Sequence, residues 1–176
     1  IFLPLSHGAC LVLAPDNCHG EEQLSQFVVD KAINILALVP SSLQALLIGL
    51  QSYTKHSLRA VCSGGETLSI KLADDFVSQT GVTLYNVYGP TEATILASSW
   101  CFSAQNWGDR NCLPIGTPFA DTQIYIVDAE QKLLPAGVNG EIVIAGGGLA
   151  RAYLHDQLLT DQKFCAASFL SSYFSP

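Results

Sequence analysis

The sequence lacks several features that mark common classes of protein. Its 176 residues include eight lysines and arginines against fifteen aspartates and glutamates, a net charge of −7. Such a balance disfavours a nucleic-acid-binding surface, which needs clustered basic side chains. No apolar run reaches the roughly 20 residues of a membrane helix, and residues 1–15 have neither a basic leader nor a small-residue cleavage site. We therefore expect no nucleic-acid partner, no membrane segment and no signal peptide.

The cysteines lack the spacing of a metal or disulfide site. None of the six forms a CxxC pair or stands at a zinc-ligand spacing from a histidine. Reduced thiols in a cytoplasmic protein are the expected state. There is also no methionine, and the local patterns are interrupted at Ile1 and Pro176. These observations predict an internal piece of a longer protein.

Up to about residue 100, apolar runs alternate with amphipathic stretches, a pattern typical of strand–helix–strand units and a mostly parallel sheet. Ser41 and Ser42 follow Pro40 as the predicted N-cap of one helix. Ligands of such sheets bind beyond the carboxyl ends of the strands, which places residues 63–66 and 88–92 at one edge. The expected strands are 8–14, 33–39, 58–62 and 83–88, and the expected helices are 21–31, 41–50 and 69–79.

Residues 114–176 have a different texture. Short alternating segments at 122–127 and 141–145 are separated by turn signals at 128–131 and 137–140. This pattern predicts antiparallel sheet or barrel.

The segment NVYGPTE, residues 86–92, has the strongest chemical signal. Thr91 can hydrogen-bond a phosphate oxygen, while Glu92 offers the hard oxygen ligand that Mg²⁺ prefers. The same residues also suit a helix start, with Thr91 as the cap and Glu92 facing the helix dipole. The spacing alone leaves both interpretations open.

Neighbouring residues could complete a nucleotide site. Tyr88 offers a flat face for a base, and the Asn86 amide can accept a hydrogen bond from an exocyclic amino group. Gly64 and Gly65 allow close approach of the backbone to a ligand because they carry no side chain. The structural alternatives are a core tyrosine, a turn asparagine and a double glycine that leads into a helix.

Four ordered motifs carry a family resemblance: LRAVCSGGETLS at 58–69, NVYGPTEATILASSW at 86–100, IGTPFADTQIYIVD at 115–128 and the segment 140–164. Together they resemble adenylate-forming, AMP-binding enzymes, and most closely the amino-acid adenylation domains of non-ribosomal peptide synthetases. The resemblance implies a Rossmann-like α/β part at 1–113, with a mostly parallel sheet and flanking helices. It also implies the start of a distorted antiparallel β-barrel subdomain at 114–176, both being parts of one larger adenylation core.

The implied activity is ligation: formation of aminoacyl-AMP and pyrophosphate from ATP with Mg²⁺, then loading of phosphopantetheine on a carrier domain. Peptidyl carrier and condensation domains are the implied partners in the parent chain. Thr91 and Glu92 take the catalytic roles, with Glu92 as the metal ligand. The implied nucleotide-binding residues are Gly64, Gly65, Glu66, Asn86, Tyr88, Gly89 and Thr91.

By the same resemblance, six residues line the pocket for the substrate side chain. None is charged and five are apolar, so a charged substrate would lose its hydration without gaining a partner. We therefore expect an apolar amino acid. The six residues are Ala37, Val61, Ser63, Val87, Ile95 and Leu96.

Some family features depart from the pattern or fall beyond these residues. Ala152 stands where the family has glycine. The family's phosphate loop and amine-binding aspartate belong before Ile1, and its ribose-binding aspartate and catalytic lysine belong after Pro176. We therefore expect the isolated chain to be inactive. An acyl- or aryl-CoA ligase of the same superfamily and a non-catalytic remnant stay open as alternatives.

Overall fold

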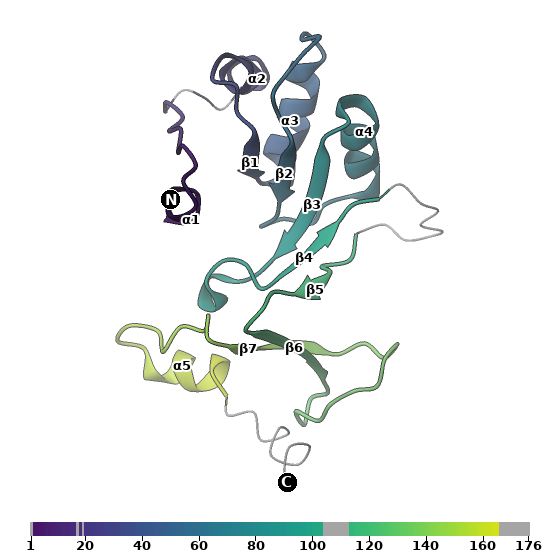
Figure 1. Ribbon diagram of the computed structural model, residues 1–176. Helices are drawn as coiled ribbons and strands as arrows, with labels where there is room; N and C mark the ends of the chain where they lie inside the picture. Colours follow the sequence, from purple (N-terminus) through teal and green to yellow (C-terminus); the bar gives the residue numbers. More distant parts are fainter. Residues whose placement is uncertain (1, 17, 19, 104–112, 166–176) are drawn as a thin grey trace. The chain divides into compact units, whose positions relative to one another are not determined.

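The computed structural model describes residues 2–16, 18, 20–103 and 113–165 (Figure 1). The chain divides into two units. The first, Ile1–Tyr88 with Ser99–Gly116, is called the sheet unit here, and the second, Gly89–Ser98 with Thr117–Pro176, the hairpin unit. The predicted division after residue 113 stays a prediction, and the two units group residues 89–98 with the later part of the chain.

Parallel strands form the centre of the sheet unit. Strands β1 (Ile35–Leu38), β2 (Ala60–Ser63) and β3 (Thr83–Tyr88) are parallel neighbours, and Ser63 lies in register with Leu38 on one side and Asn86 on the other. Strands β4 (Ser98–Cys101) and β5 (Thr117–Pro118) complete the order β1-β2-β3-β4-β5. This arrangement confirms the predicted α/β class with a mostly parallel sheet.

Three helices lie beside the parallel strands (Figure 1), and their buried apolar side chains form one core with those of the strands. They are α2 (Glu21–Asp30), α3 (Pro40–Leu50) and α4 (Ile70–Thr80). The α4 helix begins where Ser69 Oγ accepts a hydrogen bond from the Leu72 backbone N–H at 3.2 Å, and it ends at the left-handed Gly81. Over the described part of the chain, no helix is long and apolar enough to cross a membrane. The fully buried core side chains include Val28, Leu43, Leu46, Val61, Phe76 and Leu84.

Two sequence predictions for the sheet unit were wrong. Residues 8–14 form no strand, and Leu13 is 77% exposed. An apolar run forms a strand only where a neighbouring strand pairs with its backbone N–H and C=O groups. A short helix, α1 (Phe2–Ser6), precedes this run. The α3 helix starts at Pro40, with Val39 rather than a serine as its N-cap. Proline is well suited to the first position of a helix, because the N–H that it lacks would have no partner within the helix there.

The hairpin unit contains the antiparallel pair β6 (Thr122–Val127) and β7 (Glu141–Gly146), in the register that joins Thr122 with Gly146. At Gly146, φ is +133° and an added Cβ would lie 2.0 Å from Asp121 O, so only glycine fits. Helix α5 (Gln157–Lys163) and the three-residue 3₁₀ helix η1 (Thr91–Ala93) complete the unit. The described residues contain this antiparallel pair and no closed barrel.

Candidate functional site

The predicted nucleotide-binding residues of the sheet unit lie at one edge of the sheet. Gly64, Gly65 and Glu66 directly follow β2, and Asn86 and Tyr88 end β3. Because β2 and β3 are parallel neighbours, their carboxyl ends meet at the same edge, as the sequence predicted. The role of these residues toward a nucleotide stays a prediction.

Asn86 has an orientation fixed by the fold. It is 6% exposed, and its Nδ2 donates a hydrogen bond of 2.8 Å to the carbonyl oxygen of Pro114. This bond uses one of the two Nδ2 hydrogens and fixes the amide plane, and Oδ1 is the atom able to accept from an exocyclic amino group. This arrangement suits the predicted role in adenine recognition.

The loop after β2 depends on its glycines and on one acidic contact. A Cβ on Gly64 would lie 2.4 Å from Val87 O, so a side chain there would push the loop away from β3. The φ of +84° at Gly65 also favours glycine. The exposed Glu66 carboxylate accepts hydrogen bonds from Ser41 N at 3.2 Å and Ser41 Oγ at 3.3 Å. Glu66 therefore satisfies a backbone donor at the start of α3, where no local side chain caps the helix.

The predicted pocket residues differ widely in burial. Val61 and Ser63 of β2 are fully buried, and among the described residues the Ser63 hydroxyl has no hydrogen-bond partner. Ala37 is exposed and Val87 is half-buried. In the hairpin unit, Ile95 is 69% exposed and Leu96 is 42% exposed. A core role therefore describes Val61 but not Ile95.

The segment after β3 turns sharply through η1. An added Cβ on Gly89 would lie 2.5 Å from Ile95 O and 2.6 Å from Ala97 N, so the turn closes tightly upon this glycine. Thr94 and Ile95 have φ of +56° and +73°, in the left-handed region that β-branched side chains rarely adopt. Strain of this kind is typical of functional sites.

Thr91 does not cap a helix. Pro90 holds the N-cap position of η1, and no side chain there accepts a capping hydrogen bond. The Thr91 side chain is exposed and makes no hydrogen bond with the described residues. Of the two interpretations of this residue, helix capping is thus wrong, and its hydroxyl is available to a ligand.

Glu92 is anchored through both its side chain and its backbone. The Tyr153 hydroxyl donates a hydrogen bond to Glu92 Oε1, and the Ala150 N–H donates to the Glu92 carbonyl at 2.7 Å. The hydrogen bond from Tyr153 is the main cause that lowers the pKa of Glu92, with smaller contributions from the residue's own backbone N–H and the positive charge of Lys163. The same bond raises the pKa of Tyr153. The site therefore holds an ionised carboxylate.

Sequence reasoning missed Tyr153 and Ala150 as site residues. Tyr153 lies 61 positions from Glu92, far beyond any helical or strand periodicity that could connect the two. The segment 140–164 was recognised only as a family motif. The resemblance of this segment to the family was the available signal. It indicated that the chain is related to the family but did not indicate that Tyr153 contacts Glu92.

A single carboxylate suffices for the implied metal. Among the described residues, no three His, Cys, Asp or Glu side chains gather as a metal-binding cluster. The free cysteines there are Cys10, Cys18, Cys62, Cys101 and Cys165, while Cys112 lies outside the described residues. Mg²⁺ is usually bound by one or two carboxylates together with substrate phosphates and water, so the ionised Glu92 fits this ion.

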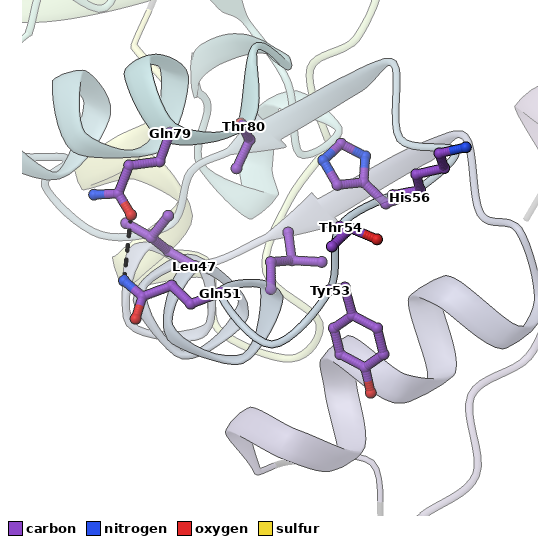
Figure 2. A pocket seen from close by; sticks show the side chains of 9 residues that line it. Leu47, Gln51, Tyr53, Thr54, His56, Gln79 and Thr80 are labelled. Atoms are coloured by element: carbon purple, nitrogen blue, oxygen red, sulfur yellow. Dashed lines mark hydrogen bonds between the residues drawn. The ribbon is translucent and has the colours of Figure 1, made fainter.

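A cavity of about 590 Å³ lies elsewhere in the sheet unit (Figure 2). It is formed by the carboxyl ends of α3 and α4 and by the loop that leads into β2, so it lies at the amino edge of the parallel strands. The predicted site residues occupy the carboxyl edge. Its lining residues are Leu47, Leu50, Gln51, Tyr53, Thr54, Lys55, His56, Gln79 and Thr80.

Residues 1–154 match the family described as AMP-binding enzyme. This range contains the loop after β2, the η1 turn and Tyr153. The chain belongs to the AMP-binding enzyme family. This confirms the resemblance seen in the four sequence motifs.

Curated relatives within this family include large synthetases. The chain is 38% identical to tyrocidine synthase 3 of Brevibacillus parabrevis over 99% of its own length and 3% of that protein. It is 33% identical to gramicidin S synthase 1 of Brevibacillus brevis over 97% of its length and 15% of the relative. The AMP-binding chain thus spans a small part of the proteins that it matches.

Solved structures agree with this assignment. A four-domain nonribosomal peptide synthetase crystallised with AMP and glycine matches 96% of the chain, and 12% of its own, with a TM-score of 0.84 and 34% identity. The anthranilate CoA ligase AuaEII in complex with anthranoyl-AMP matches 91% of the chain, and 30% of its own, with a TM-score of 0.77 and 26% identity. The α/β fold is therefore that of adenylate-forming enzymes.

Proposed function

We propose that this chain is the central part of an amino-acid adenylation domain. In the parent enzyme, a carboxylate oxygen of the amino acid bonds to the α-phosphorus of ATP as the bond to the pyrophosphate oxygen breaks. The products are aminoacyl-AMP and pyrophosphate. A phosphopantetheine thiol on a carrier domain then attacks the acyl carbon, and AMP leaves.

The anchored, ionised carboxylate of Glu92 carries this proposal. Its carbonyl and its side chain are each held by a hydrogen bond from the segment 150–153. A bound Mg²⁺ spreads the charge that develops on phosphoryl oxygens, and Glu92 is the residue that would hold it. The exposed Thr91 hydroxyl, one residue before Glu92, is suited to donate to a phosphate oxygen.

The edge of the sheet unit supplies groups suited to the base. Asn86 presents an amide held by one hydrogen bond from Nδ2 to the Pro114 carbonyl, and Tyr88 is half-buried at the end of β3. The loop that contains Gly64 and Gly65 follows the neighbouring strand. These features support adenine recognition by Asn86 and Tyr88, with Glu66 fixing the loop onto α3.

The test is amino-acid-dependent exchange of pyrophosphate into ATP by the full-length protein. Exchange that requires both Mg²⁺ and one or a few amino acids is the expected result. Absence of exchange with every amino acid, in a preparation that still binds ATP, would contradict amino-acid activation and leave a CoA ligase for another acid or a non-catalytic remnant.

A CoA ligase is the second candidate, and the match to the anthranilate CoA ligase favours it. The two activities differ in the thiol that accepts the acyl group. A thioester formed on the protein's own phosphopantetheine carrier supports the first proposal. Release of an acyl-CoA when free CoA is supplied, with no protein-bound thioester, supports the second.

A further inference from the structure

Tyr153 contacts the carboxylate that is proposed to bind the metal. The local sequence pattern does not predict this contact. Its phenol hydroxyl donates a hydrogen bond to Glu92 Oε1, and both side chains are half-buried. Glu92 lies on a three-residue 3₁₀ turn, which offers little regular structure to restrict its side chain. The phenol therefore supplies an orientation that the turn by itself does not.

The phenol is itself held by the first turn of α5. The Tyr153 backbone N–H donates to Thr160 Oγ1 at 3.0 Å, and the Thr160 hydroxyl donates to the Asp156 carbonyl at 2.7 Å. Asp156 caps α5, since its Oδ1 accepts from the Leu159 N–H at 3.0 Å. The Tyr153 ring packs edge-on against Phe164, with centroids 5.6 Å apart. Thr160 is 8% exposed, so this support is shielded from water.

Two further contacts hold the turn that carries Glu92. The Ala150 N–H donates to the Glu92 carbonyl at 2.7 Å, and the Thr94 hydroxyl donates to the Gly148 carbonyl. Thr94 and Ile95 are the residues of this turn with positive φ, so this hydrogen bond fixes the strained end of the turn. Residues 148–153 thus contact η1 through backbone and side-chain bonds in succession.

We propose that Tyr153 is a positioning residue, which fixes the Glu92 carboxylate in the orientation that receives a divalent cation. The proposal rests on the proposed function of Glu92. A carboxylate whose plane is set in advance loses less conformational freedom when the cation binds, and an unanchored carboxylate must first be ordered. Tyr153 acts through Glu92 and need not touch the nucleotide.

The test compares ATP binding by the full-length protein with and without Mg²⁺. Calorimetry in the absence of amino acid measures affinity without turnover. In Tyr153→Phe, ATP affinity in Mg²⁺ should fall by about tenfold, as expected for loss of a hydrogen bond to a charged group, while affinity in EDTA should not change. In exchange assays the variant should need more Mg²⁺ and approach wild-type turnover at saturating Mg²⁺.

Tyr53→Phe is the matched control. Its hydroxyl donates to Gln26 Oε1 at 2.6 Å in the sheet unit, so the control also removes one phenol hydrogen bond. It should leave both affinities unchanged. Equal affinity of Tyr153→Phe and wild type in Mg²⁺, or equal losses in Mg²⁺ and in EDTA, would overturn the positioning role.

A pair of variants at Thr160 decides the matter if Tyr153→Phe fails to fold. Thr160→Ser keeps the oxygen that accepts the Tyr153 N–H and should bind like wild type, whereas Thr160→Val loses this oxygen and should show the Mg²⁺-specific loss. Indistinguishable Ser and Val variants would contradict the proposal. If the wild type binds ATP with Mg²⁺ but shows no amino-acid-dependent exchange of pyrophosphate into ATP, amino-acid activation is contradicted instead. The binding comparison still tests Tyr153 in that case.

Discussion

Glu92 combines a charge that favours a cation with a location on a very short turn. Its carboxylate is ionised chiefly because the Tyr153 hydroxyl donates to it, and its carbonyl is engaged by Ala150. Neither contact needs the negative charge in order to form. Charge and fold can therefore be separated at this residue by an isosteric substitution.

Glu92→Gln in the full-length protein should lower the exchange rate at limiting Mg²⁺ by on the order of a hundredfold, because a neutral amide is a poor ligand for a hard cation. Thermal stability should hardly change, since Gln Oε1 can still accept the hydrogen bond from Tyr153. Exchange rates across a Mg²⁺ titration and a thermal melt measure the two effects.

Glu130→Gln serves as the control for this change, because Glu130 is an exposed acid in the turn after β6. It should alter neither quantity. Wild-type turnover of Glu92→Gln at limiting Mg²⁺ would remove the metal role from Glu92.

At the scale of single residues, the sequence indicated chemistry better than contacts. The amide of Asn86 and the carboxylate of Glu66 were identified by type, but their partners, Pro114 and Ser41, lie 28 and 25 positions away. Such long-range hydrogen bonds depend on tertiary packing. Local pattern therefore could not show that Glu66 contributes to the start of α3.

Among the elements, the η1 turn is closely constrained by its neighbours. The close approach of Ile95 O and Ala97 N to Gly89 leaves no space for a side chain, and two residues with positive φ follow. A β-branched residue with positive φ persists only where surrounding contacts fix it. The turn is thus set by Gly89 at one end and by residues 148–153 at the other.

Gly89→Ala in the full-length protein should disrupt this turn. A methyl group 2.5 Å from a backbone oxygen cannot be accommodated by a side-chain movement, so we expect destabilisation of at least about 1–3 kcal/mol locally. Hydrogen exchange of the amides in residues 89–98 should accelerate, and amino-acid-dependent exchange should be lost.

Gly147→Ala provides the comparison within the hairpin unit. An added Cβ at Gly147 meets no described atom within 4 Å, so its effect should stay within about 0.5 kcal/mol. Equal protection of residues 89–98 in Gly89→Ala and Gly147→Ala would show that the tight approach at Gly89 does not constrain the turn.

The elements that the sequence predicted well are those with strong periodicity. Strand β3 and strand β6 have the predicted bounds, and α4 begins after the serine expected near its start. Helix α5 was not predicted, and a helix start at η1 was only one of two open interpretations, because seven and three residues give little periodicity. The apolar run at 8–14 was misjudged because apolar character alone does not supply a ladder partner.

At the scale of the whole molecule, the chain covers only a small part of each of these relatives. This coverage bears on whether these 176 residues can be active alone. The chain matches 3% of tyrocidine synthase 3 and 15% of gramicidin S synthase 1. By the family resemblance, the phosphate loop and the catalytic lysine belong outside residues 1–176. A polypeptide of these 176 residues alone should therefore catalyse no ATP–pyrophosphate exchange, because positioning groups of this kind act as a unit. Robust amino-acid-dependent exchange by that polypeptide would contradict this assignment of the missing parts.

The substrate class can be argued from the predicted pocket residues taken together. Ala37, Val61, Val87, Ile95 and Leu96 are apolar, and Ser63 contributes one buried hydroxyl that has no partner in the part of the chain that the structure describes. In the pocket that the family resemblance implies, a charged substrate side chain would be desolvated without an opposite charge, at a penalty of several kcal/mol. An uncharged side chain meets no such penalty.

We therefore predict that the full-length protein prefers Leu, Val or Phe over Asp, Glu, Lys and Arg by at least about a hundredfold in kcat/KM. Exchange assays with an amino-acid panel measure this preference. Ser63→Ala tests the hydroxyl separately from the apolar residues. It should preserve stability, because the hydroxyl has no partner to lose among the described residues. It should lower activity selectively for substrates with a side-chain hydroxyl if Ser63 faces them. Preference for a charged amino acid in the wild type would show that these six residues do not determine the specificity.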